Sequence, residues 1–133
     1  MAWTVWTTRE PKNFTRVKEM YRTFIDHMKE HNTDPRFERL KTETVLVAYK
    51  GRSHEIGYNT NKGYEIGLCI DGEPNQIFHV LLHELAHCTV DDYDHNSDFW
   101  KNFNDLKTIC NKIGLYQTIP QKEVFCGKYI QDL

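Results

Sequence analysis

Residues 77–90, IFHVLLHELAHCTV, form the most apolar stretch of the chain. An apolar run of this length, opened by Pro74 in its first turn, predicts a buried α-helix. Within it, His83, Glu84 and His87 follow the pattern H-E-x-x-H. Two histidines one helical turn apart lie on the same face of a helix, about 5–6 Å apart at Cβ, and can share one metal ion. The stretch therefore predicts a helix that carries a metal site.

The residue types in this pattern indicate zinc and hydrolysis. Histidine nitrogens are common zinc ligands, and a catalytic zinc usually has three protein ligands and one open position. A carboxylate at Glu84 can take a proton from a zinc-bound water as it attacks a carbonyl, and can pass the proton to the leaving amine. We therefore predict Zn²⁺ as the cofactor, His83 and His87 as ligands, and Glu84 as the catalytic base.

The third protein ligand must come from outside this helix, and His95 is the strongest candidate. It follows His87 by eight residues, across a polar bend and just before the last predicted helix. Carboxylates also bind zinc. The acidic residues of the same region therefore remain as alternatives: Asp91, Asp92, Asp94 and Asp98.

Two other histidine pairs have the same spacing and serve as internal comparisons. His79 and His83 have valine where a base is needed, so His79 is predicted to be a core or boundary residue. His27 and His31 fit the inverted pattern H-x-x-E-H, but they lie near the end of a charged helix. Cys88 is disfavoured as a ligand because neighbouring helical residues point about 100° apart. The pair at His83 and His87 remains the predicted site.

Hydrophobic periodicity predicts an α+β domain around the metal helix. We expect a first helix, capped by Asn13 or Thr15 and ending near His31, and a last helix, capped by Asn96 or Ser97 and ended by Gly114. Strands are predicted at residues 44–49, 55–59 and 64–70, the first two joined as a hairpin. Residues 115–133 are expected to pack back on the domain. Because 133 residues are too few for two ordinary domains, residues 1–133 are predicted to form one.

The composition excludes several classes of protein. No apolar run approaches the length of a membrane span, and residues 1–10 lack the pattern of a secretory signal. An intracellular location, cytoplasmic or nuclear, is therefore expected, with no membrane partner. The cysteines should then be free thiols: Cys69, Cys88, Cys110 and Cys126. The net charge of -2 gives no basic field for nucleic acid, so DNA is a possible partner that the net charge does not indicate.

Residues 57–106 carry several further motifs in a fixed order. A G-x-N-x-N-x-G turn at residues 57–63 is followed by an apolar strand with Ile66 and Leu68. HELAH comes next, and then an H-x-x-x-F motif formed by His95 and Phe99. In this order the chain resembles the WLM family, the Wss-like metallopeptidases related to the SprT and Spartan proteases.

The resemblance implies a minimal zincin fold and a zinc-dependent endopeptidase that hydrolyses proteins, notably proteins crosslinked to DNA. It also supports His83, His87 and His95 as ligands and Glu84 as base. The strand before the zinc helix is expected to bind the substrate backbone by β-augmentation. This assigns substrate binding to four residues of that strand: Tyr64, Ile66, Gly67 and Leu68.

Two other functions remain as alternatives at this point. The first is a zinc-stabilised interaction module without turnover, and the second is a nucleic-acid-binding accessory domain. Glu84 argues against the first, because a structural zinc site needs no base and is usually closed by a fourth protein ligand. The net charge argues against the second.

Overall fold

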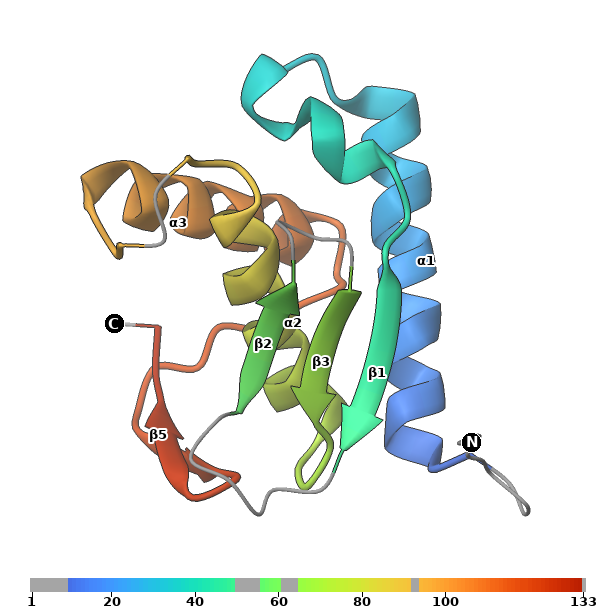
Figure 1. Cartoon of the computed structure of the whole chain (residues 1–133), viewed down its shortest axis with the longest axis vertical. Coiled ribbons are helices and arrows are strands. Elements are labelled where there is room, and N and C mark those ends of the chain that lie inside the picture. Colours follow the sequence, from blue (N-terminus) through green and yellow to red (C-terminus); the bar gives the residue numbers. More distant parts are fainter. Residues whose placement is uncertain (1–9, 50–55, 61–64, 92–93, 133) are drawn as a thin grey trace.

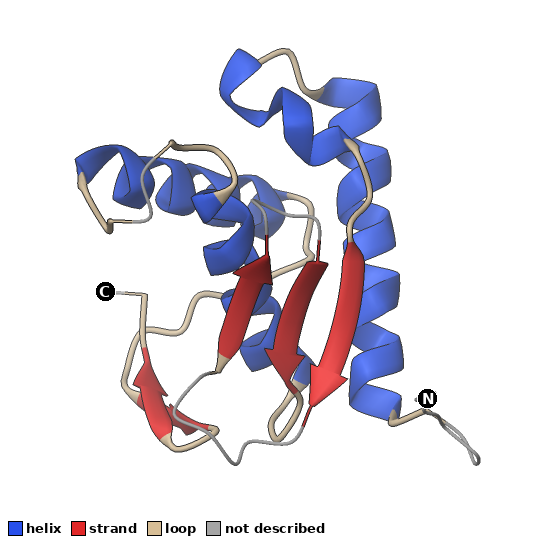
Figure 2. Ribbon diagram, viewed as in Figure 1, coloured by secondary structure: helices blue, strands red, loops and turns tan. Residues whose placement is uncertain are grey.

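The computed structural model describes residues 10–49, 56–60, 65–91 and 94–132. Its helices and strands form the predicted α+β fold (Figure 2). In Figure 1, α1 and α2 lie behind a small sheet, and α3 runs across the top of α2. The elements in chain order are α1 (Lys12–His31), the 3₁₀-helix η1 (Pro35–Lys41), β1 (Val45–Tyr49), β2 (Gly57–Thr60), β3 (Glu65–Cys69), α2 (Pro74–His87), α3 (Ser97–Lys112), β4 (Glu123–Phe125) and β5 (Lys128–Ile130).

The three-stranded sheet has β3 at its centre, in the order β1-β3-β2. β1 runs parallel to β3, and β2 runs antiparallel to it. The predicted hairpin between the first two strands is therefore wrong, because both strands pair with β3. The burial agrees with this order. Ile66 and Leu68 of β3 are fully buried, whereas Val45 at the start of β1 is 59% exposed, so the central strand is also the most buried one.

Gly67 is a position in β3 where there is no room for a side chain. A Cβ atom added there would lie 2.0 Å from Cε2 of Tyr58, its cross-strand partner on β2. The Tyr58 ring thus occupies the space above the glycine, and it stacks on Tyr49 with 6.0 Å between ring centroids. An aromatic ring over a glycine in the neighbouring strand restores the packing that the glycine lacks. Gly67 is therefore required by the packing of the sheet.

Helix α1 ends at His31 as predicted, but its first turn differs from the prediction. The helix begins at Lys12, and no side chain caps it. Asn13, one of the two predicted caps, instead donates hydrogen bonds from Nδ2 to the carbonyls of Ile70 and Gly72, at 2.6 and 3.0 Å. The start of α1 thereby holds the end of β3 and the turn that leads into α2.

Helix α2 begins at Pro74 and ends at His87, before the predicted limit near Val90. The last carbonyl groups of a helix have no partner within the helix. Here neighbouring side chains bind several of the carbonyls in this region. Asn59 on β2 donates to the Glu84 carbonyl at 2.7 Å, and Thr89 donates to the Ala86 carbonyl at 2.6 Å. These bonds fix the turn of α2 that carries the H-E-x-x-H residues.

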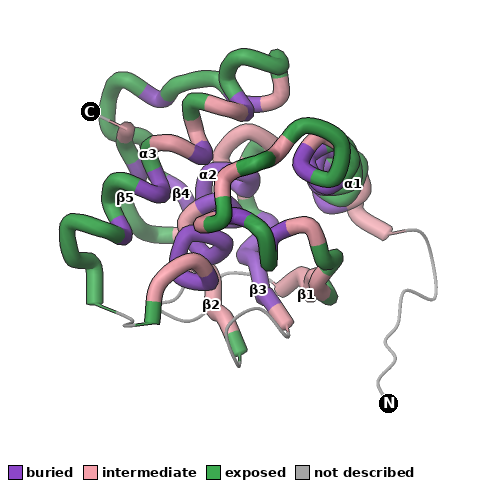
Figure 3. The backbone as a smooth tube through the Cα atoms, turned by 90° about the horizontal axis from the view of Figure 1, so that it is seen from above, coloured by how far each residue is buried: buried purple, intermediate pink, exposed green. Residues whose placement is uncertain are grey.

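The core lies between α2, β3 and the inner faces of α1 and α3, where the buried segments meet in Figure 3. Five fully buried phenylalanines come from five different parts of the chain: Phe24, Phe37, Phe78, Phe99 and Phe125.

None of the helices in the described ranges is long and apolar enough to cross a lipid bilayer.

The C-terminal segment packs back on the domain as predicted. β4 and β5 form a hairpin whose turn residues, Cys126 and Gly127, have φ angles of 50° and 80°. Tight two-residue hairpin turns require such positive φ angles. Cys126 forms a disulfide with Cys69 at the end of β3. The expectation of four free thiols is therefore wrong: two cysteines are joined, and Cys88 and Cys110 are buried outside any disulfide. The pair lies 57 residues apart, which explains why spacing did not suggest it.

Candidate metal centre

His83, His87 and His95 come together at the C-terminal end of α2. Their ring centroids are 4.9 to 5.1 Å apart in all three pairs. One possible ligand nitrogen of each histidine lies within 4.8 Å of the others, and Nε2 of His87 is 3.1 Å from Nε2 of His95. Two nitrogens at about 2.0–2.1 Å from one tetrahedral zinc lie roughly 3.4 Å apart, so the three rings fit a metal of that size.

His95, the third histidine, lies just before the N-cap residue of α3. The Asn96 side chain caps this helix by accepting a hydrogen bond from the Phe99 N–H at 3.0 Å. Phe99 is fully buried, and its ring lies 5.0 Å from the ring of His83, 4.4 Å from that of His87 and 4.8 Å from that of His95. The H-x-x-x-F motif thus has a physical basis, because the phenylalanine is a shared wall against which all three imidazoles pack.

The acidic alternatives to His95 do not join this cluster. Asp91, Asp94 and Asp98 are exposed, and among the residues with described positions the ligand group contains the three histidines alone. Asp92 lies outside the described residues. The geometry therefore favours His95 over the carboxylates as the third ligand.

Two further clusters of ligand-type side chains are weaker candidates. Ligand atoms of Cys69, Asp71 and Cys126 also lie within 4.8 Å of one another, but the two sulfurs are bonded to each other. This cluster therefore lacks the thiolates that bind a metal. His27 and His31 have ring centroids 4.9 Å apart, and Glu30 lies 3.1 Å from His31, but in the described ranges no third ligand-type atom lies within 4.8 Å of both histidines.

Glu84 is 8% exposed and lies between His83 and the edge strand β2. Its Oε2 is 3.5 Å from Nδ1 of His83. On the strand side, a Cβ atom added to Gly57 would lie 3.3 Å from the same oxygen and 2.6 Å from Cγ1 of Val80. The glycine therefore allows the backbone of β2 to approach α2 closely, beside the carboxylate.

The predicted substrate strand is contradicted by the topology of the sheet. Ile66, Gly67 and Leu68 belong to β3, which is hydrogen-bonded to β1 on one side and β2 on the other. A peptide can add only to an open edge, so these residues cannot take a substrate by β-augmentation. Tyr64 lies outside the described residues. The edge strand beside Glu84 is β2.

His79 lies one turn before His83 and is buried, as predicted for a core residue. Its Nδ1 is 2.8 Å from the Tyr116 hydroxyl oxygen and 3.2 Å from Oδ1 of Asp132. Residues 115–133 were predicted to pack on the domain, but no motif indicated that Tyr116 and Asp132 would contact His79. Along with Gly57 and Asn59, whose motif was noted without a physical role, Asp132 is a residue near the site that pattern alone did not explain.

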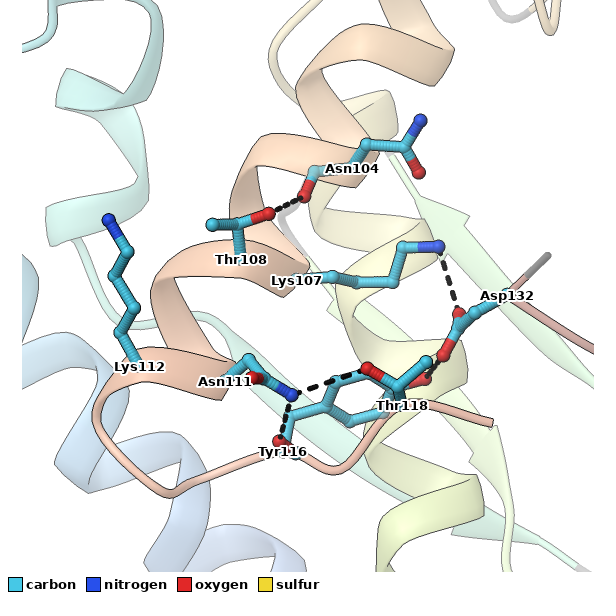
Figure 4. A pocket seen from close by; sticks show the side chains of 8 residues that line it. All are labelled: Asn104, Lys107, Thr108, Asn111, Lys112, Tyr116, Thr118 and Asp132. Carbon is cyan, nitrogen blue, oxygen red and sulfur yellow. Dashed lines mark hydrogen bonds and ion pairs between the residues drawn. The ribbon is translucent and has the colours of Figure 1, made fainter. Parts of the chain in front are cut away.

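A depression away from the three histidines, shown in Figure 4, is lined by side chains of a different kind. It has a volume of about 460 Å³ and lies along the C-terminal half of α3. The described residues that line it include no histidine, cysteine or glutamate, and its one acid, Asp132, pairs with Lys107 at 2.9 Å. The depression therefore offers no metal-binding set. Its lining residues are Asn104, Lys107, Thr108, Asn111, Lys112, Tyr116, Thr118 and Asp132.

Comparison with known proteins identifies the family of this chain. The model of the WLM domain matches residues 42–128, which include the three strands of the sheet, α2 and α3. No curated protein matches the chain. Among solved structures, the metallopeptidase zymogen of Pyrococcus abyssi abylysin aligns with 77% of this chain and 99% of its own, at 17% identity and a TM-score of 0.46. The chain belongs to the WLM domain family, a family of metalloproteases.

Proposed function

We propose that the protein is a zinc-dependent endopeptidase, with His83, His87 and His95 as the metal ligands and Glu84 as the general base. One observation carries this proposal: three imidazoles converge, and the Glu84 carboxylate lies 3.5 Å from the His83 ring. Neutral imidazole is a preferred zinc ligand, and three histidines leave one position open for catalysis. When bound, zinc supplies a Lewis acid for the hydrolysis of a peptide carbonyl.

The burial of the histidines supports a catalytic site over a structural one. His87 is 6% exposed, whereas the His83 side chain is 27% exposed and His95 is exposed. The cluster is therefore buried on the side of α2 and Phe99 and open on the other side. A structural zinc site would be closed by a fourth protein ligand, and the described ligand group has three members.

Glu84 is the group that moves the proton. Its carboxylate accepts a proton from the attacking water and returns it to the leaving nitrogen, so that a neutral amine departs. The backbone beneath it is held by Asn59, which donates to the Glu84 carbonyl at 2.7 Å. Because Asn59 belongs to β2, one hydrogen bond ties the base to the edge strand. We assign the substrate backbone to this edge, where it would lie beside the carboxylate.

Unfolded or exposed segments of proteins are the proposed substrates, and DNA is not required. Several basic side chains in the described part of the chain form ion pairs with acids, which reduces the attraction of these side chains for phosphate. The pairs include Lys18 with Glu10, Arg22 with Glu43, Arg36 with Asp34, and Lys107 with Asp132. Binding to a nucleic acid needs unneutralised cations, so hydrolysis is expected to proceed at the same rate with and without single-stranded DNA.

The direct test combines metal analysis with a cleavage assay on an unfolded protein such as reduced casein. We expect about one zinc per chain, loss of cleavage when a chelator removes it, and recovery when zinc is restored. Each reaction is run with and without single-stranded DNA. Zinc without cleavage under both conditions would favour the interaction module, and cleavage only with DNA would overturn the assignment of the substrate class.

Gly57→Ala should impair both folding and turnover. The added methyl would lie 2.6 Å from Val80 and 3.3 Å from the Glu84 carboxylate, so β2 must move away from α2. Overpacking of this kind costs about 1–3 kcal/mol, and we expect at least a tenfold loss of kcat/KM because Glu84 loses its alignment. Melting temperature and peptide hydrolysis measure the two effects.

Gly114→Ala is the matched control for this substitution. Gly114 has a φ angle of 74° at the end of α3, but a Cβ there meets no atom within 4 Å. The variant should lose about 1–2 kcal/mol of stability because alanine is strained at a positive φ angle, and it should keep the turnover of the wild type. Equal turnover in both variants would show that Gly57 does not position the base.

A further inference from the structure

A cavity of about 360 Å³ opens beside the candidate metal centre and shares His83 and Glu84 with it. This volume lies within the range of about 300–1,000 Å³ that is usual for ligand pockets. Its walls come from four parts of the chain: Ile56 and Gly57 at the edge strand, His79 and Val80 on α2, Trp100 and Phe103 on α3, and residues 128–131 of the C-terminal segment.

The walls of this cavity are mainly apolar and aromatic. Val80 and Phe103 are nearly fully buried and form the inner part. Trp100 and Tyr129 are large apolar side chains that are nevertheless 46% and 68% exposed. Exposed aromatic side chains around an apolar cavity mark a binding surface. Glu84 is the single acid among the described lining residues, and it already has a role.

The C-terminal wall is held by two covalent or charged anchors, one at each end. At one end the Cys69–Cys126 disulfide joins the β4–β5 turn to the end of β3. At the other end the Asp132 side chain is 5% exposed and accepts hydrogen bonds from the Tyr116 hydroxyl and, at 2.7 Å, from the Ile119 N–H. Figure 4 shows Tyr116 and Lys107 directed toward this carboxylate. The wall is therefore pre-formed.

Charge keeps the Asp132 anchor in place at neutral pH. Burial alone would raise the pKa of this carboxyl, but hydrogen bonds from His79, the Ile119 N–H and Tyr116, together with the Lys107 ammonium, lower it well below its usual range. A lowered pKa in the folded state means that the bond stabilises the fold above the unfolded value of about 3.9 and weakens only in acid. The Asp132 carboxylate therefore keeps its hydrogen bonds to the C-terminal wall at neutral pH.

We infer that this cavity receives the side chain of a substrate residue next to the scissile bond, and that it selects large apolar and aromatic residues. The inference rests on the proposed function, because the shared residues His83 and Glu84 place the cavity beside the reacting atoms. Trp100 and Tyr129 contribute from α3 and from the C-terminal segment, so they determine specificity. Burial of apolar surface supplies the selectivity.

The test compares two labelled peptides that differ at one residue beside a single cleavable bond, phenylalanine in one and alanine in the other. For the wild type we expect kcat/KM to be about ten- to a hundredfold higher for the phenylalanine peptide. Trp100→Ala and Tyr129→Ala should each reduce this ratio at least threefold, with zinc content unchanged. Val124→Ala is the control, because Val124 is 66% exposed on the same hairpin and does not line the cavity.

Binding is measured in parallel by fluorescence anisotropy with zinc-loaded Glu84→Gln, so that the result does not depend on turnover. Equal affinity for the two peptides, or an unchanged preference in both wall variants, would overturn the inference. Tighter binding of the phenylalanine peptide together with no cleavage by the wild type would keep the pocket and overturn the proposed peptidase. The two proposals therefore fail by different results.

Discussion

Glu84→Gln is expected to lower the rate of peptide hydrolysis by about 10²- to 10⁴-fold, the usual contribution of a general base. Glutamine has nearly the same size as glutamate and still forms hydrogen bonds, but it cannot accept the proton of the attacking water. The Glu84 side chain is 10% exposed, and its Oε2 is 3.5 Å from Nδ1 of His83, so a side chain of nearly the same size fills the same space on α2. Turnover, zinc content and melting temperature are measured together, and the last two should stay close to the wild type.

Glu30→Gln makes the same chemical change at an exposed position of α1 and should have no effect on hydrolysis. Its side chain is 77% exposed, next to His31 in the inverted H-x-x-E-H pattern. If Glu84→Gln cleaves as fast as the wild type, Glu84 is not the base. If Glu30→Gln is the slower of the two variants, the metal site must be sought on α1.

The local features of the site could be predicted because they depend on residues that are close in sequence. One helical turn brings His83 and His87 to the same face, and the same period places Glu84 beside them. His95 was the preferred third residue because it stands in the polar bend just before the helix that Asn96 or Ser97 was predicted to cap. The packing of Phe99 on all three rings is a finding of the structure. Each of these features needs fewer than about twenty residues of sequence.

The pairing of strands and cysteines was not predictable in the same way. Two strands that are close in sequence were predicted to form a hairpin, yet the sheet places β3, its most buried strand, between the other two. This one difference places β3 at the centre of the described sheet and β2 at one of its two edges, so the predicted substrate strand cannot accept a peptide as an added strand. The Cys69–Cys126 bond and the Asp132 anchor likewise join residues that are distant in sequence or carry no motif.

Removal of any one of the three histidines should weaken zinc binding by at least about 100-fold. Loss of an outer-sphere partner of a zinc ligand already costs about 10- to 100-fold, and here a ligand itself is lost. His95→Ala is the most informative variant, because His95 is exposed and its removal leaves the packed side of the cluster intact. Zinc affinity is measured by competition with a chromogenic chelator, with circular dichroism to confirm that the variant folds.

His31→Ala is the matched control, since it removes an exposed histidine from the rival pattern on α1 and should leave zinc affinity unchanged. Loss of His95 leaves two histidines at i and i+4 on α2. Weak zinc binding should therefore persist in His95→Ala, and the zinc affinity should fall again in the double variant with His87→Ala. If His95→Ala keeps full zinc affinity, the third ligand must be one of the nearby carboxylates, Asp91, Asp92, Asp94 or Asp98. The polar bend between α2 and α3 would then have to take a different conformation to bring that carboxylate to the metal.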